Sequence, residues 1–234
     1  GEGADGEGAD GEDTAAASEA ASEAASEAAG LAVATLHKLS KGGSSEVRAA
    51  LGVSSVATQL LVDQLVSSGS SADEKQAAAS SLRQLCGEPA ARNVVVRGGG
   101  VATLVALARA EGIETPSDEH GRIDMRSRQR KETAPALLTA LAAPPHSAAV
   151  ADAGGTAVLI EALEHGSAEL VLAAVGALGP LVEVPSGRDA MVAAGVPPTV
   201  RLLGSRSEAV AQHALGVLRR LAAQRDGQEA IGAA

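Results

Sequence analysis

The side chains that most often carry out chemistry in proteins are few and widely spaced in this sequence of 234 residues. There is one cysteine, Cys86, and its position directly after Leu85 in an apolar stripe favours a small core residue over a nucleophile. The histidines have no spacing typical of metal ligands: His37, His120, His146, His165 and His213. We therefore predict no metal site and no nucleophilic catalysis.

The glycine clusters also lack the residues that a phosphate-binding loop needs. No Gly-Lys-Ser/Thr sequence follows Gly98–Gly100, and Lys41 lies before its glycines instead of after them. The sequence contains no Phe, Tyr or Trp, which removes base-stacking platforms and cages for quaternary ammonium groups. We expect a protein that is not an enzyme and that has no cofactor and no small-molecule substrate.

Charge and composition narrow the choice of partners. The net charge is −10, but residues 1–29 hold nine acidic and no basic side chains, so the remaining chain is close to neutral. A near-neutral body lacks the clustered basic surface that binds nucleic acid. No apolar run is long enough to span a membrane, and no signal peptide is recognisable. With a single cysteine, the chain fits a reducing compartment, so we expect a cytoplasmic protein, with a cytoskeletal or ciliary assembly as a specific setting.

Residues 1–29 differ in composition from the rest of the chain. They begin with the acidic repeat GEGAD and continue with repeats of Ala-Ala-Ser-Glu. Neither part offers a broad apolar face, so we predict a low-complexity tail that is disordered to marginally helical. Because the sequence begins with Gly1, we expect a processed chain or a piece of a longer one.

Beyond residue 30, one apolar pattern recurs. Five segments share the spacing Ala-x3-Leu-x2-Leu: Ala32-Leu36-Leu39, Ala78-Leu82-Leu85, Ala134-Leu138-Leu141, Ala174-Leu178-Leu181 and Ala214-Leu218-Leu221. Positions i, i+4 and i+7 lie on one face of a helix, so each segment predicts a helix with one buried stripe. The last leucines lie 46, 56, 40 and 40 residues apart. A period near 40 with two insertions predicts a helical solenoid.

A glycine junction recurs in the same register. Glycines at Gly99, Gly154 and Gly195 precede apolar stretches, and glycine adopts the left-handed conformation that ends many helices. Pro197 and Pro198 are compatible with the first turn of the helix that follows. Each repeat is thus predicted to contain a short helix, a second helix and a third helix that carries the leucine stripe.

These features resemble one known family. The segment from Gly195 to Leu203, followed by Ala214, Leu218 and Leu221, is similar to a complete armadillo repeat. The resemblance covers residues 30–234 and implies an all-α fold, a right-handed superhelical armadillo-type α-solenoid. It consists of a leading third helix and about four repeats, near residues 55–99, 100–154, 155–194 and 195–234.

In armadillo proteins the third helices line a concave groove that holds an extended partner. Counting back from the last leucine, positions −8, −5 and −1 face that groove. Position −1 is occupied by Lys38, Gln84, Ala140, Pro180 and Arg220, and position −5 by Ala34, Ser80, Ala136, Gly176 and Gly216. Neither the Asn at −1 nor the Trp at −5 of the nuclear-signal receptors is present, so a nuclear transport receptor is the weakest alternative.

The resemblance places a partner-binding groove on a specific set of residues. The candidates are Lys38, Gln84, Ala136, Ala140, Gly176, His213 and Arg220. Basic side chains lie at the two ends, and the middle is small and apolar, with Ala177 included. Lys38 and Arg220 are equally compatible with ordinary solvated charges.

The insertion at residues 112–131 runs from an acidic half to a basic half. We favour a solvated spacer for this segment. The alternatives are a partner-docking loop, a loop regulated by phosphorylation at Ser127 or Thr133, and a weak nuclear-localisation patch.

The preferred function is a non-catalytic scaffold or adaptor that binds other proteins, as a subunit of a larger cytoplasmic or cytoskeletal assembly. The second alternative is a regulatory fragment of a larger, enzymatic chain.

Overall fold

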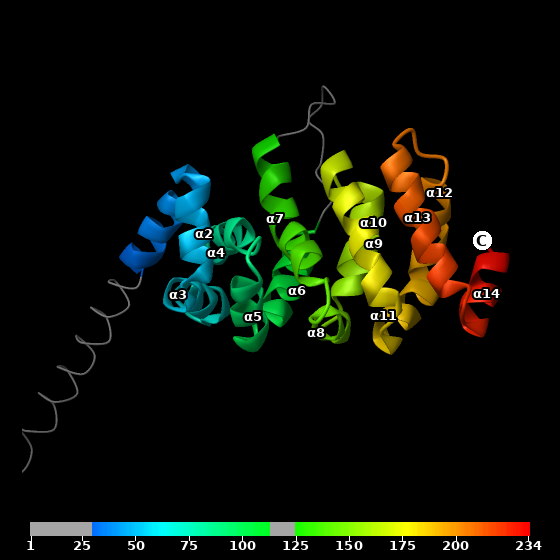
Figure 1. The fold of residues 1–234 in the computed structure, drawn as a ribbon, viewed down its shortest axis with the longest axis horizontal. Coiled ribbons are helices and arrows are strands. Elements are labelled where there is room, and N and C mark those ends of the chain that lie inside the picture. The colour runs from blue at the N-terminus through cyan, green and yellow to red at the C-terminus, as the bar shows by residue number, and fades with distance from the viewer. Residues whose placement is uncertain (1–29, 113–124) are drawn as a thin grey trace, which may run out of the picture.

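The computed structural model describes residues 30–112 and 125–234. The predicted tail at 1–29 and the central part of the insertion lie outside the described residues. Within the described ranges every regular element is a helix and none is a strand. The elements follow one another along the long axis of the molecule, from residue 30 at one end to α14 at the other (Figure 1).

Three kinds of helix alternate along the chain. The short first helices are α2 (Ser45–Val53), α5 (Pro89–Arg97), α8 (Ser147–Asp152), α11 (Pro185–Ala190) and α14 (Arg225–Gly232). The second helices are α3 (Ser55–Val66), α6 (Gly100–Glu111), α9 (Gly155–His165), and the π-helix η1 (Met191–Gly195) with α12 (Val196–Leu202). The third helices are α4 (Ala72–Leu85), α7 (Met125–Leu141), α10 (Ala168–Val182) and α13 (Glu208–Leu221), and residues 30–42 form a helix that precedes them.

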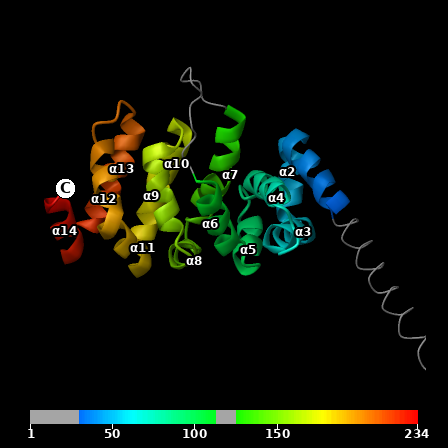
Figure 2. The same ribbon diagram turned by 180° about the vertical axis from the view of Figure 1, so that it is seen from behind.

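Helices of the same kind stack on one another. The third helices pack in the order α4, α7, α10 and α13, and the second helices pack in the order α3, α6, α9 and α12. Figure 2, the view from behind, shows α5, α8 and α11 along one edge of this array. The surface formed by the third helices is called the third-helix face below.

The predicted stripe is confirmed on all four of these third helices. Their stripe alanines and leucines are buried, and Leu85, Leu141, Leu181 and Leu221 are no more than 1% exposed. Serine N-caps begin three of them, because the hydroxyls of Ser71, Ser167 and Ser207 accept a hydrogen bond from the first-turn backbone. Spacing and capping thus act together to set the rotation and the start of each helix.

On the helix at 30–42 the predicted stripe is wrong. Leu39 is 43% exposed and Leu36 is only half-buried, whereas Val33 and Ser40 are buried. This helix contacts α4 through His37, whose Nδ1 lies 2.8 Å from the hydroxyl of Ser81. The face that meets α4 is therefore rotated by about one residue from the stripe of the other third helices.

The glycine junctions are confirmed at two of three positions. Gly99 and Gly154 have φ values of 77° and 84°, in the left-handed region that favours glycine. Gly195 is different, because its φ is −84° and the chain continues from η1 into α12. At this position glycine permits close approach instead, since a Cβ atom would collide with the sulfur of Met191.

The insertion is shorter as a loop than predicted. Residues 125–131 belong to α7, which is the longest described helix at 17 residues. Arg130 forms an ion pair with Asp73 of α4 at 2.6 Å, and the Gln76 amide donates to the Arg130 carbonyl. The basic half of the insertion therefore extends a third helix and ties it to its neighbour.

Candidate functional site

Most of the predicted groove residues lie on the surface of the third helices. Four of them are exposed: Lys38, Gln84, His213 and Arg220. Ala136, Ala140 and Gly176 are half-buried, which leaves the central part of the third-helix face without large side chains. Ala177 is only 9% exposed, so its predicted place in the groove is wrong, because it turns toward the core.

The structure brings only some of these residues together. His213 on α13 lies over Gly176 on α10, so that a Cβ atom at position 176 would be 3.9 Å from the imidazole. Arg220 extends back to α10, where its Nε lies 3.4 Å from a carboxylate oxygen of Glu183. The charge of Arg220 is therefore partly balanced by a neighbour on the same face. Lys38 lies on the first described helix, at the other end of the array.

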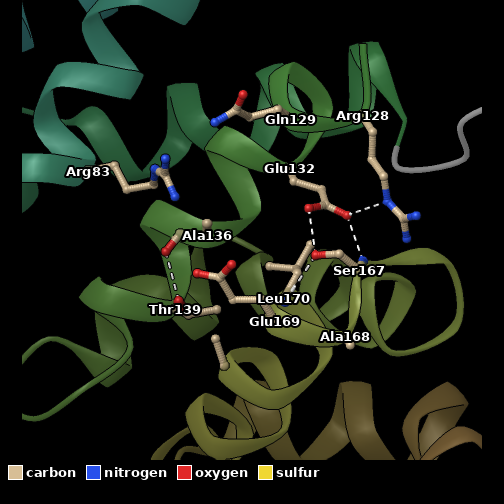
Figure 3. A pocket seen from close by; sticks show the side chains of 11 residues that line it. Arg83, Arg128, Gln129, Glu132, Ala136, Thr139, Ser167, Ala168, Glu169 and Leu170 are labelled. Atoms are coloured by element: carbon tan, nitrogen blue, oxygen red, sulfur yellow. Dashed lines mark hydrogen bonds and ion pairs between the residues drawn. The ribbon is translucent and has the colours of Figure 1, made fainter. Parts of the chain in front are cut away.

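A hollow of about 650 Å³ opens on the third-helix face between α7 and α10, with one wall completed by α4. Ala136, Thr139 and Ala173 provide its small surfaces. The charged and amide side chains that line it are Arg83, Arg128, Gln129, Glu132 and Glu169 (Figure 3). Ala136 is the only predicted groove residue among the lining residues of this hollow.

Two of the charges in the hollow neutralise one another. Arg128 donates from its Nε to Glu132 at 3.1 Å, one turn apart on α7. Glu132 also accepts two hydrogen bonds from Ser167, which begins α10. This network joins the two helices that border the hollow.

Apart from Ala136, the residues that line this hollow are not indicated by the repeat pattern of the sequence. Arg83 and Glu169 lie at helix positions other than −8, −5 and −1, and they belong to different repeats. Arg128 belongs to the basic half of the insertion, which the sequence predicts to be a loop, and Gln129 carries no signal of its own in the sequence. The hollow could be predicted only from the length of α7, and that length depends on knowing that the helix begins at Met125.

The structure contradicts the hypothesis that Thr133 is a phosphorylation site. Its side chain is 5% exposed, and its hydroxyl donates to the Gln129 carbonyl at 2.9 Å. A kinase cannot reach a hydroxyl that is buried in a helix interface, so phosphorylation at Thr133 is wrong for the folded chain. Ser127 lies on α7 and is exposed.

Cys86 lies in the core, as predicted, with 2% of its surface exposed. Burial raises the pKa of its thiol to about 12, and the nearby Arg92 opposes this rise. The thiol is therefore protonated at neutral pH and is a poor nucleophile. Among residues 30–112 and 125–234, no three His, Cys, Asp or Glu side chains are grouped as a metal site would require.

No single helix in the described ranges is long and apolar enough to cross a membrane. One bent pair, Ser45–Val53 with Ser55–Val66, satisfies that length and composition only when both are counted together across a 79° bend.

Comparison with known proteins gives a consistent assignment of the fold. Residues 185–223 match the model of the Armadillo/beta-catenin-like repeat. This segment includes α11, η1, α12 and α13, which are one first, one second and one third helix. No curated protein sequence matches the chain.

Several solved structures are similar to the whole described array. Computationally designed armadillo repeat proteins for modular peptide recognition match with a TM-score of 0.64 and 21% identity, over 86% of this chain and 80% of theirs. A designed armadillo repeat protein in complex with the peptide (KR)4 matches with a TM-score of 0.60 and 19% identity, over 86% and 79%. The resemblance inferred from the sequence is confirmed: the chain carries an armadillo repeat at residues 185–223 and folds as an all-α armadillo-type solenoid.

Proposed function

We propose that this protein is a non-catalytic scaffold or adaptor that binds a partner protein along its third-helix face, the concave groove of the armadillo fold. The observation that carries the proposal is the hollow of about 650 Å³ between α4, α7 and α10. It lies beside half-buried small residues, so a polypeptide can approach the helix backbones closely there. Binding sites are commonly concave surfaces in which a few polar groups fix the orientation of the ligand.

The fold itself supports a polypeptide as the occupant. Helical solenoids present extended surfaces that suit long, flexible partners. One of the structural neighbours, a designed armadillo repeat protein, is in complex with the peptide (KR)4. With one cysteine, and that one buried, the chain suits a reducing compartment, so we propose a cytoplasmic assembly, including a cytoskeletal one, as its setting.

A site-directed cross-linking experiment tests the proposed surface. A photoreactive amino acid at Ala140 should capture a partner from cell extract, because Ala140 is half-buried on the third-helix face. The matched control is the same amino acid at Ala157, which is exposed on the second helix α9. Capture through position 157 alone would move the binding surface to the second helices.

Two substitutions test whether partner binding depends on the shape of the third-helix face. Ala140→Arg and Gly176→Leu should each block partner capture, because both add bulk to the central part of the third-helix face. Ala157→Arg adds the same bulk on α9 and should leave capture unchanged. Circular dichroism melting curves must show that all three variants remain folded. Turnover of a substrate by the purified chain would overturn the non-catalytic assignment.

A further inference from the structure

Two charged side chains face the hollow from different helices without a partner among the described residues. Arg83 projects from α4 and Glu169 from α10, and both point toward the space that they line (Figure 3). The Nε of Arg83 is buried and has no hydrogen-bond acceptor within residues 30–112 and 125–234. Arg128 and Glu132, the other two charges in the hollow, already pair with each other. One positive and one negative side chain thus line the hollow without an ion-pair partner among the described residues, and the Glu169 side chain is exposed.

Gln129 contributes an amide at the rim of the same hollow. The side chain is exposed on α7, and its amide C=O and NH2 groups make no hydrogen bond within the described part of the chain. A side-chain amide offers one acceptor and two donors, which match the N–H and C=O groups of an extended backbone. The hollow therefore combines a cation, an anion and a backbone-binding group.

We propose that the hollow recognises an extended polypeptide segment that carries one acidic and one basic side chain on the same side. The acidic side chain binds Arg83, the basic side chain binds Glu169, and the segment's backbone binds Gln129. This inference rests on the proposed function, and it names the chemistry of the partner at that surface. Recognition shifts from position −1 of the third helices to the space between α7 and α10.

The charges explain why a mixed segment is preferred. A carboxylate that enters the hollow can accept hydrogen bonds from the Arg83 guanidinium, which lines it, and carboxylate–guanidinium pairs are among the stronger hydrogen-bonded contacts. A segment with two acidic groups would be repelled by Glu169, and one with two basic groups by Arg83. In an extended chain, side chains two or four residues apart project to the same side, so these spacings are the ones to test.

Defined peptides test the proposal on the 234-residue chain. The probes are short fluorescent Gly/Ser peptides that carry one Glu and one Lys, two or four residues apart, in either order. Comparison peptides carry two Glu, two Lys or no charge. Fluorescence anisotropy at low salt should show the best mixed peptide binding at least about fivefold more tightly than each comparison peptide, as expected for roughly 1 kcal/mol per partly exposed charge contact.

Variants of the two charged residues assign the contacts. Arg83→Gln should remove the gain in affinity that the peptide Glu provides. Glu169→Gln should remove the gain in affinity that the peptide Lys provides. Arg83→Glu should reverse the selectivity, so that the peptide with two Lys binds most tightly. Gln129→Ala should weaken all peptides similarly, because it removes a contact to the backbone.

The chain offers matched controls on α13. Arg219 lies two residues before the last leucine of its helix, as Arg83 does, and Glu208 lies in the first turn, as Glu169 does. Arg219→Glu and Glu208→Gln should leave the peptide preference unchanged. Melting curves establish that each variant is folded.

The outcomes separate this inference from the proposed function. Equal affinity for mixed and like-charged peptides, or a loss of selectivity in the α13 controls as large as in the variants of the hollow, would overturn the inference. If cross-linking through Ala140 still captures a partner and Arg83→Glu leaves this capture unchanged, the proposed function stands and only the inference fails. Absence of capture through Ala140 would count against both.

Discussion

The carboxylate of Glu132 on α7 accepts two hydrogen bonds from Ser167 at the start of α10, one from the backbone N–H at 2.6 Å and one from the hydroxyl at 2.7 Å. The Ser167 hydroxyl in turn accepts a hydrogen bond from the Leu170 N–H. This single carboxylate therefore connects the extended helix of the insertion-bearing repeat to the capped end of the next third helix. The connection fixes the distance between two walls of the hollow.

Replacing Glu132 by Ala should destabilise the protein, because it leaves the Ser167 N–H without its acceptor in a half-buried position. The loss should be about 1–3 kcal/mol, the usual cost of an unsatisfied partner. Gln212→Ala is the matched control, since Gln212 has the equivalent position on α13 but bonds only within its own helix. Urea denaturation measures both, and equal midpoints for the two variants would contradict the role of the Glu132 network.

The thiol of Cys86 should be unreactive while the protein is folded. Because its pKa is about 12, the thiol is almost entirely protonated at about pH 8, and because it is buried, a reagent cannot reach the sulfur. A colorimetric thiol reagent should react slowly with native protein and quickly after denaturant is added. Rapid, complete labelling without unfolding would show that Cys86 is exposed in solution.

Much of the fold follows from local spacing in the sequence. The leucines at i+4 and i+7 predict which face of each third helix is buried, and this holds for residues such as Leu138 and Leu178. The same spacing predicts the wrong buried face at Leu39, because it identifies an apolar face but not the element that packs against it. On that helix the contact between His37 and Ser81, which are 44 residues apart, determines the rotation.

The candidate site was less predictable than the fold, for a different physical reason. The groove positions follow from the register of each helix separately, and Ala136 and Ala140 do lie on the third-helix face. The hollow, however, depends on the space between helices from three repeats. Whether Arg83 and Glu169 line a common space is set by the length and spacing of α7 and α10, which no local pattern encodes.

His146 should make stability depend on pH. Burial lowers the pKa of its imidazole, and the charges of Arg92 and Arg97 lower it further. The unfolded chain, with a pKa near 6.5, therefore takes up the proton at a higher pH than the folded chain does. This contribution to stability is fully present above pH 6.5 and is lost as the pH falls from there through the lowered pKa of the folded state.

The expected result is a fall in melting temperature between about pH 7.5 and pH 5.5 that is smaller in His146→Gln than in the wild type. Other groups titrate over the same range, so the difference between the variant and the wild type is the quantity to compare. Identical pH profiles for His146→Gln and the wild type would contradict the shift.

The leucine stripe of α10 is buried, whereas the predicted stripe of the helix at 30–42 is partly exposed, and substitutions should distinguish the two. Leu178 is fully buried on α10, so Leu178→Ala should cost about 2–5 kcal/mol in the free energy of unfolding. Leu39 carries the same stripe position in the sequence pattern as Leu181 but is 43% exposed, so Leu39→Ala should cost far less. Ala174→Leu should also destabilise, by about 1–3 kcal/mol, because a fully buried alanine leaves no room for a larger side chain. Urea denaturation of the three variants gives the comparison, and a loss at Leu39 equal to that at Leu178 would show that the helix at 30–42 buries the face that its sequence predicts.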